Sequence, residues 1–172
     1  MSLIEIVRKV SPMGLMDGFV GFTGFNTLHG VIKEQTQNGH MANNFTALFH
    51  AGTAAPIALS YILSGNAKIY YLLQKFCSGY FAYDTFYTIK YRKFNLTSAM
   101  FCYHHLASIY YLHQNPTSYM AHQVIFWGEL SNLPSYFVYY YLKTNKDPKM
   151  LKWLKKLQFC LYSFCLLYTS DA

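Results

Sequence analysis

The chain has 172 residues, of which 53% are hydrophobic, 19% aromatic and only 12% charged. A soluble domain carries about 25% charged residues, so this composition argues against a disordered, coiled-coil, collagen-like or disulfide-rich chain and indicates a lipid-embedded protein. The formal charge of +7 would favour a nucleic-acid partner in a soluble protein. Here the basic residues lie at the ends of apolar segments, so we expect membrane lipids with anionic headgroups as the partner, and no nucleic acid.

Six apolar segments follow one another and predict an all-α, polytopic membrane bundle of about six helices. The N-terminal region, residues 1–43, contains a weak first membrane helix at 12–31, which five glycines interrupt. At 1.5 Å per residue, the following segments have about the right length to cross a bilayer core of ~30 Å. These segments are 44–63, 69–89, 97–113 and 118–142. The sixth, 153–168, stops early, and residues 165–172 (CLLYTSDA) match the translation of a common sequencing-library adapter, so we expect a non-native tail after a truncated last helix.

The connections between these segments are short, which places consecutive helices antiparallel. Turn signals stand at Asn38-Gly39, Ser64-Gly65-Asn66, Asn95 and Asn115-Pro116. With six spans, ten basic residues fall on one side and four on the other, so the positive-inside rule assigns the ten to the cytosol and the N-terminus to the lumen. The ten are Lys33, Lys90, Arg92, Lys93, Lys143, Lys146, Lys149, Lys152, Lys155 and Lys156, and the four are Arg8, Lys9, Lys68 and Lys75.

Ionisable side chains inside membrane helices are costly and are therefore candidates for function. A turn centred near Phe94 places Asp84 opposite His104, about 15 Å deep at 1.5 Å per residue. A turn centred near Asn115 places Glu129 opposite Phe101, about one helical turn from the doublet His104-His105. We therefore expect Asp84, His104, His105 and Glu129 to form one buried polar cluster.

Helical spacing extends this cluster along one helix. His122, Glu129 and Tyr136 recur every seven residues, and Asn132 lies three residues after Glu129, so the four share one stripe. A polar stripe on an apolar helix faces protein or water rather than lipid. The residues that we expect to line a lipid cavity are His50, His122, Glu129, Ser131, Asn132 and Tyr136.

Three interpretations of the cluster remain open. A histidine oriented by a carboxylate can act as a base or nucleophile in acyl transfer, with His104, His105 and Asp84 as the catalytic residues. Two histidines and a carboxylate also suit iron or zinc. However, the His boxes of membrane di-iron enzymes need an earlier histidine, at Phe101 or Cys102, so we expect no metal site. In the third interpretation the charges only satisfy one another and fix the helix register.

Four short motifs in this order resemble those of the TLC-domain membrane family, which includes ceramide synthases and smaller lipid-related proteins. The matching pieces are LFHAG with His50, GYFAYD with Asp84, CYHHLAS with His104-His105, and GELSNLPSYF with Glu129, Ser131 and Asn132. The resemblance implies a TLC-like domain over residues 44–168, with a central cavity open to lipid. It also implies a location in the endoplasmic reticulum or a related membrane.

The resemblance also implies a role for the His pair. In ceramide synthases this pair belongs to the site that moves an acyl group from acyl-CoA to a long-chain base. His104 and His105 match that pair, and Asp84 matches the acidic residue on the preceding helix. The synthases follow with a second cluster of aspartates, where this chain has Glu129-Leu130-Ser131-Asn132. The chain therefore resembles more closely the small TLC proteins of membrane lipid homeostasis. We expect it to bind or modulate lipids without a cofactor, with acyl transfer from acyl-CoA as the alternative.

Overall fold

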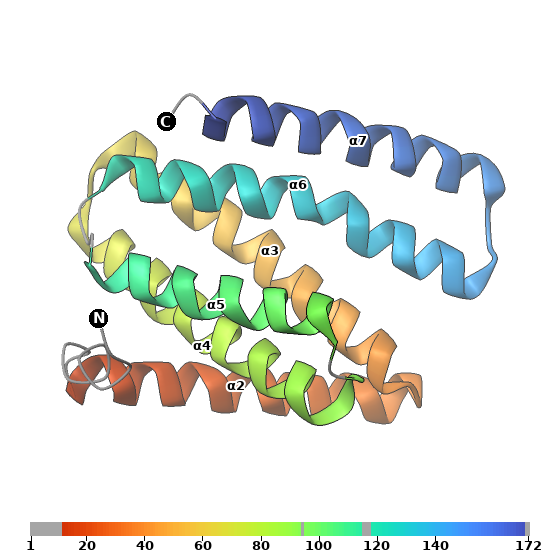
Figure 1. The fold of residues 1–172 in the computed structure, drawn as a ribbon, viewed down its shortest axis with the longest axis horizontal. Coiled ribbons are helices and arrows are strands. Elements are labelled where there is room, and N and C mark those ends of the chain that lie inside the picture. The colour runs from red at the N-terminus through yellow and green to blue at the C-terminus, as the bar shows by residue number, and fades with distance from the viewer. Residues whose placement is uncertain (1–11, 94, 115–117, 171–172) are drawn as a thin grey trace. The chain divides into compact units, whose positions relative to one another are not determined.

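The computed structural model describes residues 12–93, 95–114 and 118–170, with side chains for residues 18–166. The described residues form six α-helices and no strand (Figure 1), so the all-α prediction is confirmed. The helices are α2 (Pro12–Thr36), α3 (Gly39–Ser64), α4 (Ala67–Tyr91), α5 (Leu96–Gln114), α6 (Tyr119–Thr144) and α7 (Pro148–Ser170).

Each helix matches one of the predicted apolar segments and extends it by a few residues at one or both ends, except that α6 begins one residue after its predicted start. The last helix begins earlier than expected, because α7 includes a lysine-rich stretch before the apolar residues from 153 onward. Some predictions concern residues outside the described ones. They are the turn positions Phe94 and Asn115, the cations Arg8 and Lys9, and the end of the tail at 171–172.

The helix ends follow the predicted turn signals. The side chain of Asn38 caps α3, because its Oδ1 atom accepts from the backbone N–H groups of His40 and Met41, both at 3.0 Å. Gly65 ends the same helix with a φ of 63°, in the left-handed region that glycine adopts without strain. Asn95 starts α5 in the same way as Asn38, since its Oδ1 atom accepts from the N–H of Ser98 at 2.9 Å.

The chain divides into two compact units. The first contains residues 67–118 and the part of α2 up to residue 28, and α4 packs against α5 within it. In this unit α2 crosses α4 at two glycines. A Cβ atom added to Gly79 would lie 2.5 Å from the Cα atom of Gly21, so neither position has room for a side chain. Phe25 packs beside this crossing against the rings of Phe76 and Tyr80.

The second unit contains residues 29–66 and 119 onward, and here α6 contacts both α3 and α7. The buried residues of α3 are mostly small, which lets neighbouring helices approach closely. Six of them are the alanines Ala42, Ala47, Ala51, Ala54, Ala55 and Ala58. A polar contact also joins α3 to α6, since the Asn44 amide donates to the Tyr136 carbonyl at 3.0 Å. Consecutive order along the chain therefore does not decide this packing, because α3 pairs with α6.

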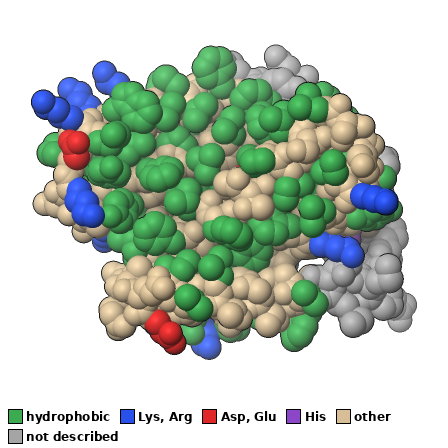
Figure 2. All heavy atoms as spheres, turned by 180° about the vertical axis from the view of Figure 1, so that it is seen from behind, with side chains coloured by type: hydrophobic (Ala, Val, Ile, Leu, Met, Phe, Trp, Pro, Cys, Tyr) green, Lys and Arg blue, Asp and Glu red, His purple; other side chains and the backbone are tan. Residues whose placement is uncertain are grey.

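One helix in the described part of the chain, α3, is long and apolar enough to cross a membrane, judged by length and composition. About 44% of its apolar window is buried. The other helices contain polar residues, and α4, α5 and α6 also many tyrosines, which lower their mean hydropathy. Hydrophobic side chains are nevertheless spread over the face seen in Figure 2, and Lys and Arg stand mainly near its edges. Beyond α3, the predicted spans stay predictions.

Candidate functional site: two histidine–carboxylate pairs

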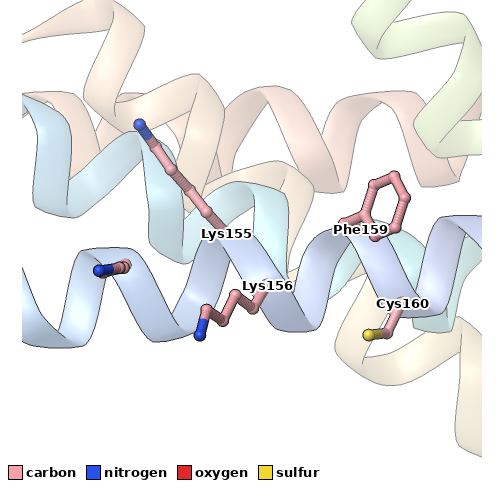
Figure 3. Close-up of a pocket in the computed structure, with 5 residues that line it drawn as sticks. Lys155, Lys156, Phe159 and Cys160 are labelled. Atoms are coloured by element: carbon pink, nitrogen blue, oxygen red, sulfur yellow. The ribbon is translucent and has the colours of Figure 1, made fainter.

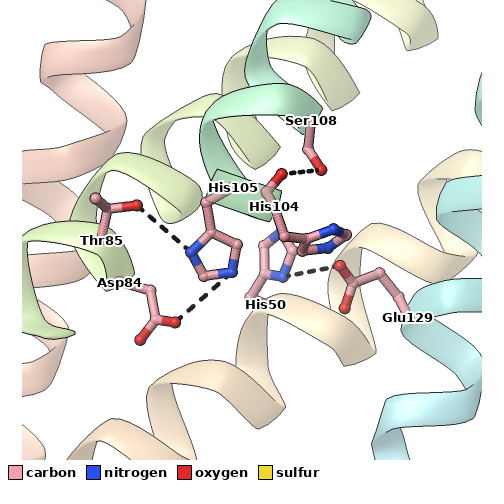
Figure 4. A network of polar contacts seen from close by, with 7 residues as sticks. All are labelled: His50, Asp84, Thr85, His104, His105, Ser108 and Glu129. Carbon is pink, nitrogen blue, oxygen red and sulfur yellow. Dashed lines mark hydrogen bonds and ion pairs between the residues drawn. The ribbon is translucent and has the colours of Figure 1, made fainter. Parts of the chain in front are cut away.

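In the first unit, Asp84 on α4 pairs with His105 on α5. The Asp84 Oδ2 atom lies 3.8 Å from His105 Nε2, and both side chains are nearly buried. The Thr85 hydroxyl lies 3.5 Å from the other ring nitrogen, Nδ1. Figure 4 shows both α4 side chains directed at the imidazole. One nitrogen of His105 thus faces a carboxylate and the other a hydroxyl.

Helical spacing explains this arrangement. Phe81, Asp84 and Thr85 stand at positions i, i+3 and i+4 of α4, so they lie on one face. The Phe81 ring stacks on the His105 imidazole with 5.1 Å between centroids and 19° between planes. The aromatic ring therefore fixes the plane of the imidazole, while the two polar neighbours face its nitrogens.

The partner of Asp84 differs by one residue from the predicted one. The hairpin arithmetic places Asp84 opposite His104, whereas the structure pairs it with His105. His104 is exposed, and its carbonyl accepts from the Ser108 hydroxyl at 2.8 Å. Consecutive residues point about 100° apart on a helix, so only one member of the doublet can face α4.

In the second unit, Glu129 on α6 pairs with His50 on α3. The Glu129 Oε1 atom lies 3.6 Å from His50 Nδ1, and the His50 side chain is fully buried. This pair connects two helices that are distant along the sequence, as Figure 4 shows for the two labelled side chains. Because the two pairs belong to different units, a single cluster of Asp84, the His doublet and Glu129 stays a prediction.

Three of the four residues of the predicted stripe, His122, Glu129 and Tyr136, lie at the contact with α3, whereas Asn132 contacts α7. The His122 ring stacks on Tyr61 with 3.7 Å between centroids. Glu129 meets His50, and the carbonyl of Tyr136 accepts from Asn44. The residue numbers of each pair add up to a nearly constant value, as two antiparallel helices in close contact require. These three residues therefore belong to a ladder of polar contacts between α3 and α6.

Ser131 and Asn132 lie elsewhere on α6. The Ser131 hydroxyl is buried and donates to the Gly128 carbonyl at 2.8 Å, within its own helix. The Asn132 Oδ1 atom accepts from the Tyr162 hydroxyl of α7 at 2.9 Å. Asn132 thus contributes to the contact between α6 and α7, and its role in lining a lipid cavity stays a prediction.

Sequence reasoning missed a third polar group, at the end of α5. The Leu112 carbonyl accepts from the Tyr70 hydroxyl and from the Gln74 amide. His113 lies within hydrogen-bond distance of Gln74 and of the Ser78 hydroxyl. These α4 side chains satisfy a carbonyl that the end of a helix leaves without an intrahelical partner. The spacing of four residues between Gln74 and Ser78 was the available signal.

The chemistry open to the two pairs follows from their distances. At 3.8 and 3.6 Å the carboxylates are ion-pair partners of a protonated imidazole and lie beyond hydrogen-bond distance. Each pair therefore brings an acidic and a basic side chain together in the interior of its unit. Among the described residues, no three His, Cys, Asp or Glu side chains stand close enough together to hold a metal ion.

No family model, curated protein or solved structure matches the chain.

Proposed function

We propose that the chain is a multi-pass membrane protein of the TLC type, which binds or modulates lipids within the bilayer of the endoplasmic reticulum or a related membrane. The pair of His105 and Asp84 carries the proposal, because it is a nearly buried acid–base pair in a chain with few charges. Such a pair can hydrogen-bond the polar part of a lipid that apolar helices surround. Glu129 and His50 offer the same chemistry in the second unit.

The membrane location is supported by what the helices expose. Large apolar side chains are solvent-exposed in both units, among them Phe19 (70%) and Leu96 (80%) in the first and Leu63 (78%) in the second. A water-soluble protein rarely exposes apolar patches larger than a few hundred Å². With a candidate span in α3 and long helices throughout the described residues, lipid tails are the cover that best suits these exposed side chains.

Lipid retention tests this proposal. The full chain purified in a neutral detergent should carry a reproducible set of co-purified lipids, measured by mass spectrometry. His105→Gln and Asp84→Asn should reduce the retained lipid at least ~3-fold, since each removes one polar contact worth about 1 kcal/mol. His104→Gln is the matched control. Because His104 is exposed, this substitution should leave the amount of retained lipid unchanged. Equal losses in all three variants, or no bound lipid in the native chain, would overturn the proposal.

A second candidate function is acyl transfer from acyl-CoA to the amine of a long-chain base, and the His105–Asp84 pair also favours it. In this reaction His105 removes a proton from the amine of the long-chain base, and the amine nitrogen attacks the thioester carbonyl. The C–S bond then breaks, and the coenzyme A thiolate leaves. The Asp84 carboxylate stabilises the imidazolium that forms. In this candidate reaction His105 and Asp84 act on acyl-CoA and the long-chain base, and the reaction needs no cofactor.

Turnover distinguishes the two candidates. An enzyme in reconstituted membranes should release coenzyme A from acyl-CoA when a long-chain base is added, and His105→Ala should lower that rate by ~100-fold or more. His104→Ala should keep most of the rate if His105 alone is the base. A lipid-binding protein shows no release in any variant but keeps its bound lipid in His104→Ala. Release that survives His105→Ala would exclude this pair as the catalytic group.

A further inference from the structure

Helix α7 has two different halves on its outward side. Its first half contains four lysines, and its second half exposes large apolar side chains. Phe159 is 74% exposed and Phe164 is 63% exposed. The lysines are Lys149, Lys152, Lys155 and Lys156, and none of them has an ion pair with another described residue. The polarity therefore changes along the helix axis, between Lys156 and Phe159.

Packing against α6 determines which side of α7 faces outward. Leu154 is buried, and the Gln158 amide donates to the Ser135 hydroxyl of α6 at 3.0 Å. At 100° per residue, Lys152 and Lys156 stand on the side opposite Leu154. The lysines are thus held outward by the same contacts that attach α7 to its unit.

Three of these lysines surround a shallow, open hollow on α7. Its lining is Lys152, Lys155, Lys156, Phe159 and Cys160, which Figure 3 draws as sticks on the helix. Ammonium groups beside an exposed aromatic ring suit an amphipathic ligand whose anionic part lies next to an apolar part. The hollow is too open to enclose a small molecule, so its occupant has to be an extended surface.

The turn before α7 adds further positive charge. The Lys146 ammonium donates to the Tyr140 hydroxyl at 2.9 Å, and this hydrogen bond raises the pKa of Lys146. Lys143 lies 5.8 Å from the centroid of the Tyr139 ring. The nearby carboxylate, Asp147, is engaged at the helix start, where its Oδ1 atom accepts from the N–H of Lys149 at 2.9 Å. The region is therefore strongly cationic at neutral pH.

We propose that the outward side of α7 binds the surface of an anionic phospholipid leaflet, with Lys152, Lys155 and Lys156 at the headgroup phosphates and Phe159 and Phe164 among the acyl chains. From Lys152 to Phe164 the helix rises about 18 Å, which is enough to pass from the headgroup layer into the hydrocarbon. Charge complementarity selects this occupant, because each lysine near an anionic surface adds to the binding. The inference shares only the membrane location with the proposed function and does not use the histidine–carboxylate pairs.

The test measures which lipid the full chain prefers in neutral detergent. Dioctanoyl phosphatidylglycerol and dioctanoyl phosphatidylcholine are titrated separately, and the fluorescence of Trp153, which is exposed on α7, reports binding. The native chain should prefer phosphatidylglycerol by at least ~10-fold, and K152Q/K155Q/K156Q should lose most of that preference. The matched control K90Q/R92Q/K93Q removes the same charge from the first unit and should change the preference less than ~2-fold. Equal losses in both triple variants would show a bulk charge effect and overturn the proposal.

The apolar half is tested separately. F159Q/F164Q should weaken the binding of both lipids several-fold while the preference for phosphatidylglycerol remains; unchanged binding would overturn the insertion of these side chains. Inorganic phosphate or a DNA duplex that displaced phosphatidylglycerol at equal phosphate concentration would also overturn the proposal. K152Q/K155Q/K156Q should keep the co-purified lipids whose retention tests the histidine–carboxylate site, so a failure of that site is distinguishable from a failure of this one.

Discussion

The two histidine–carboxylate pairs have the same chemistry in different surroundings. His50 is fully buried, and its pair with Glu129 is one contact of a ladder between α3 and α6 that also contains the stacked rings of Tyr61 and His122. The pair of His105 and Asp84 also belongs to a row of polar contacts, because Gln74 and Ser78 of α4 meet His113 further along α5, but its histidine is not fully buried. It stacks on Phe81 and adjoins an exposed histidine, His104.

This difference distinguishes a structural role from a ligand-binding role, which the sequence alone does not distinguish. A buried pair within a ladder fixes the register of two helices, and its loss strands a polar group in the interior. The His105 side chain is 9% exposed, whereas His50 is 0% exposed, and His105 adjoins an exposed imidazole, so a ligand has more access to this pair. We therefore assign the main structural role to the pair in the second unit and the binding role to the pair in the first.

The largest effect is expected for Glu129→Ala. This change leaves the buried His50 imidazole without its carboxylate, and breaking a buried pair costs about 3–5 kcal/mol. We expect a correspondingly large fall in the free energy of unfolding, measured by denaturant titration of the purified chain in detergent.

A double variant provides the control for this result. Replacing both partners by apolar residues, as in His50→Leu with Glu129→Met, removes the stranded group and should recover most of the lost stability. If the double variant is no more stable than Glu129→Ala alone, the pair does not act as a unit, and the assignment of its structural role is wrong.

The next effect concerns the crossing of α2 and α4 in the first unit. Gly79→Ala places a methyl group 2.5 Å from the Cα atom of Gly21, so the helices have to separate, at a cost of about 1–3 kcal/mol. Gly24→Ala is the matched control, since nothing lies within 4 Å of its added Cβ atom. It should stabilise α2 by up to ~1 kcal/mol through helix propensity. Thermal unfolding followed by circular dichroism compares the two, and a Gly79→Ala chain as stable as Gly24→Ala would contradict the close crossing.

The sequence predicted the helices well, because their signals are local. Apolar runs of sufficient length and the capping residues Asn38, Gly65 and Asn95 determine where the chain forms helices and where it turns. The heptad spacing of His122, Glu129 and Tyr136 also predicted correctly that these residues share one face of α6.

The contacts between helices were harder to predict. Hairpin arithmetic depends on the centre of a turn, and an error of half a residue there pairs Asp84 with His104 in place of His105. The partner of Glu129 was out of reach for a different reason. The arithmetic compares consecutive helices, whereas α3 and α6 pack together across two intervening helices. The small residues Gly21 and Gly79 could have indicated a close crossing, but several other glycines in the chain have open space around them.

A smaller effect on stability is expected for Asp84→Ala. His105 keeps its stacking on Phe81 and its contact with Thr85, so we expect a loss of about 1 kcal/mol in the free energy of unfolding. Measured beside Glu129→Ala under the same conditions, it tests the proposed difference between the two pairs directly. A loss as large as that of Glu129→Ala would show that both pairs hold the fold in the same way.

The smallest effect is expected for Tyr162→Phe, at the contact between α6 and α7. The change removes the hydrogen bond from the Tyr162 hydroxyl to Asn132, but the site is exposed, and Gln158 still donates to Ser135 beside it. A loss of about 0.5 kcal/mol follows, because the neighbouring hydrogen bond still attaches α7 to α6. Tyr103→Phe, at a tyrosine that is 70% exposed, is the matched control and should change nothing. Because the ladder between α3 and α6 does not depend on this bond, α7 should become more accessible to proteolysis while α3 and α6 stay protected. Simultaneous cleavage in all three helices would show that the second unit unfolds as one and that α7 is not its weakest attachment.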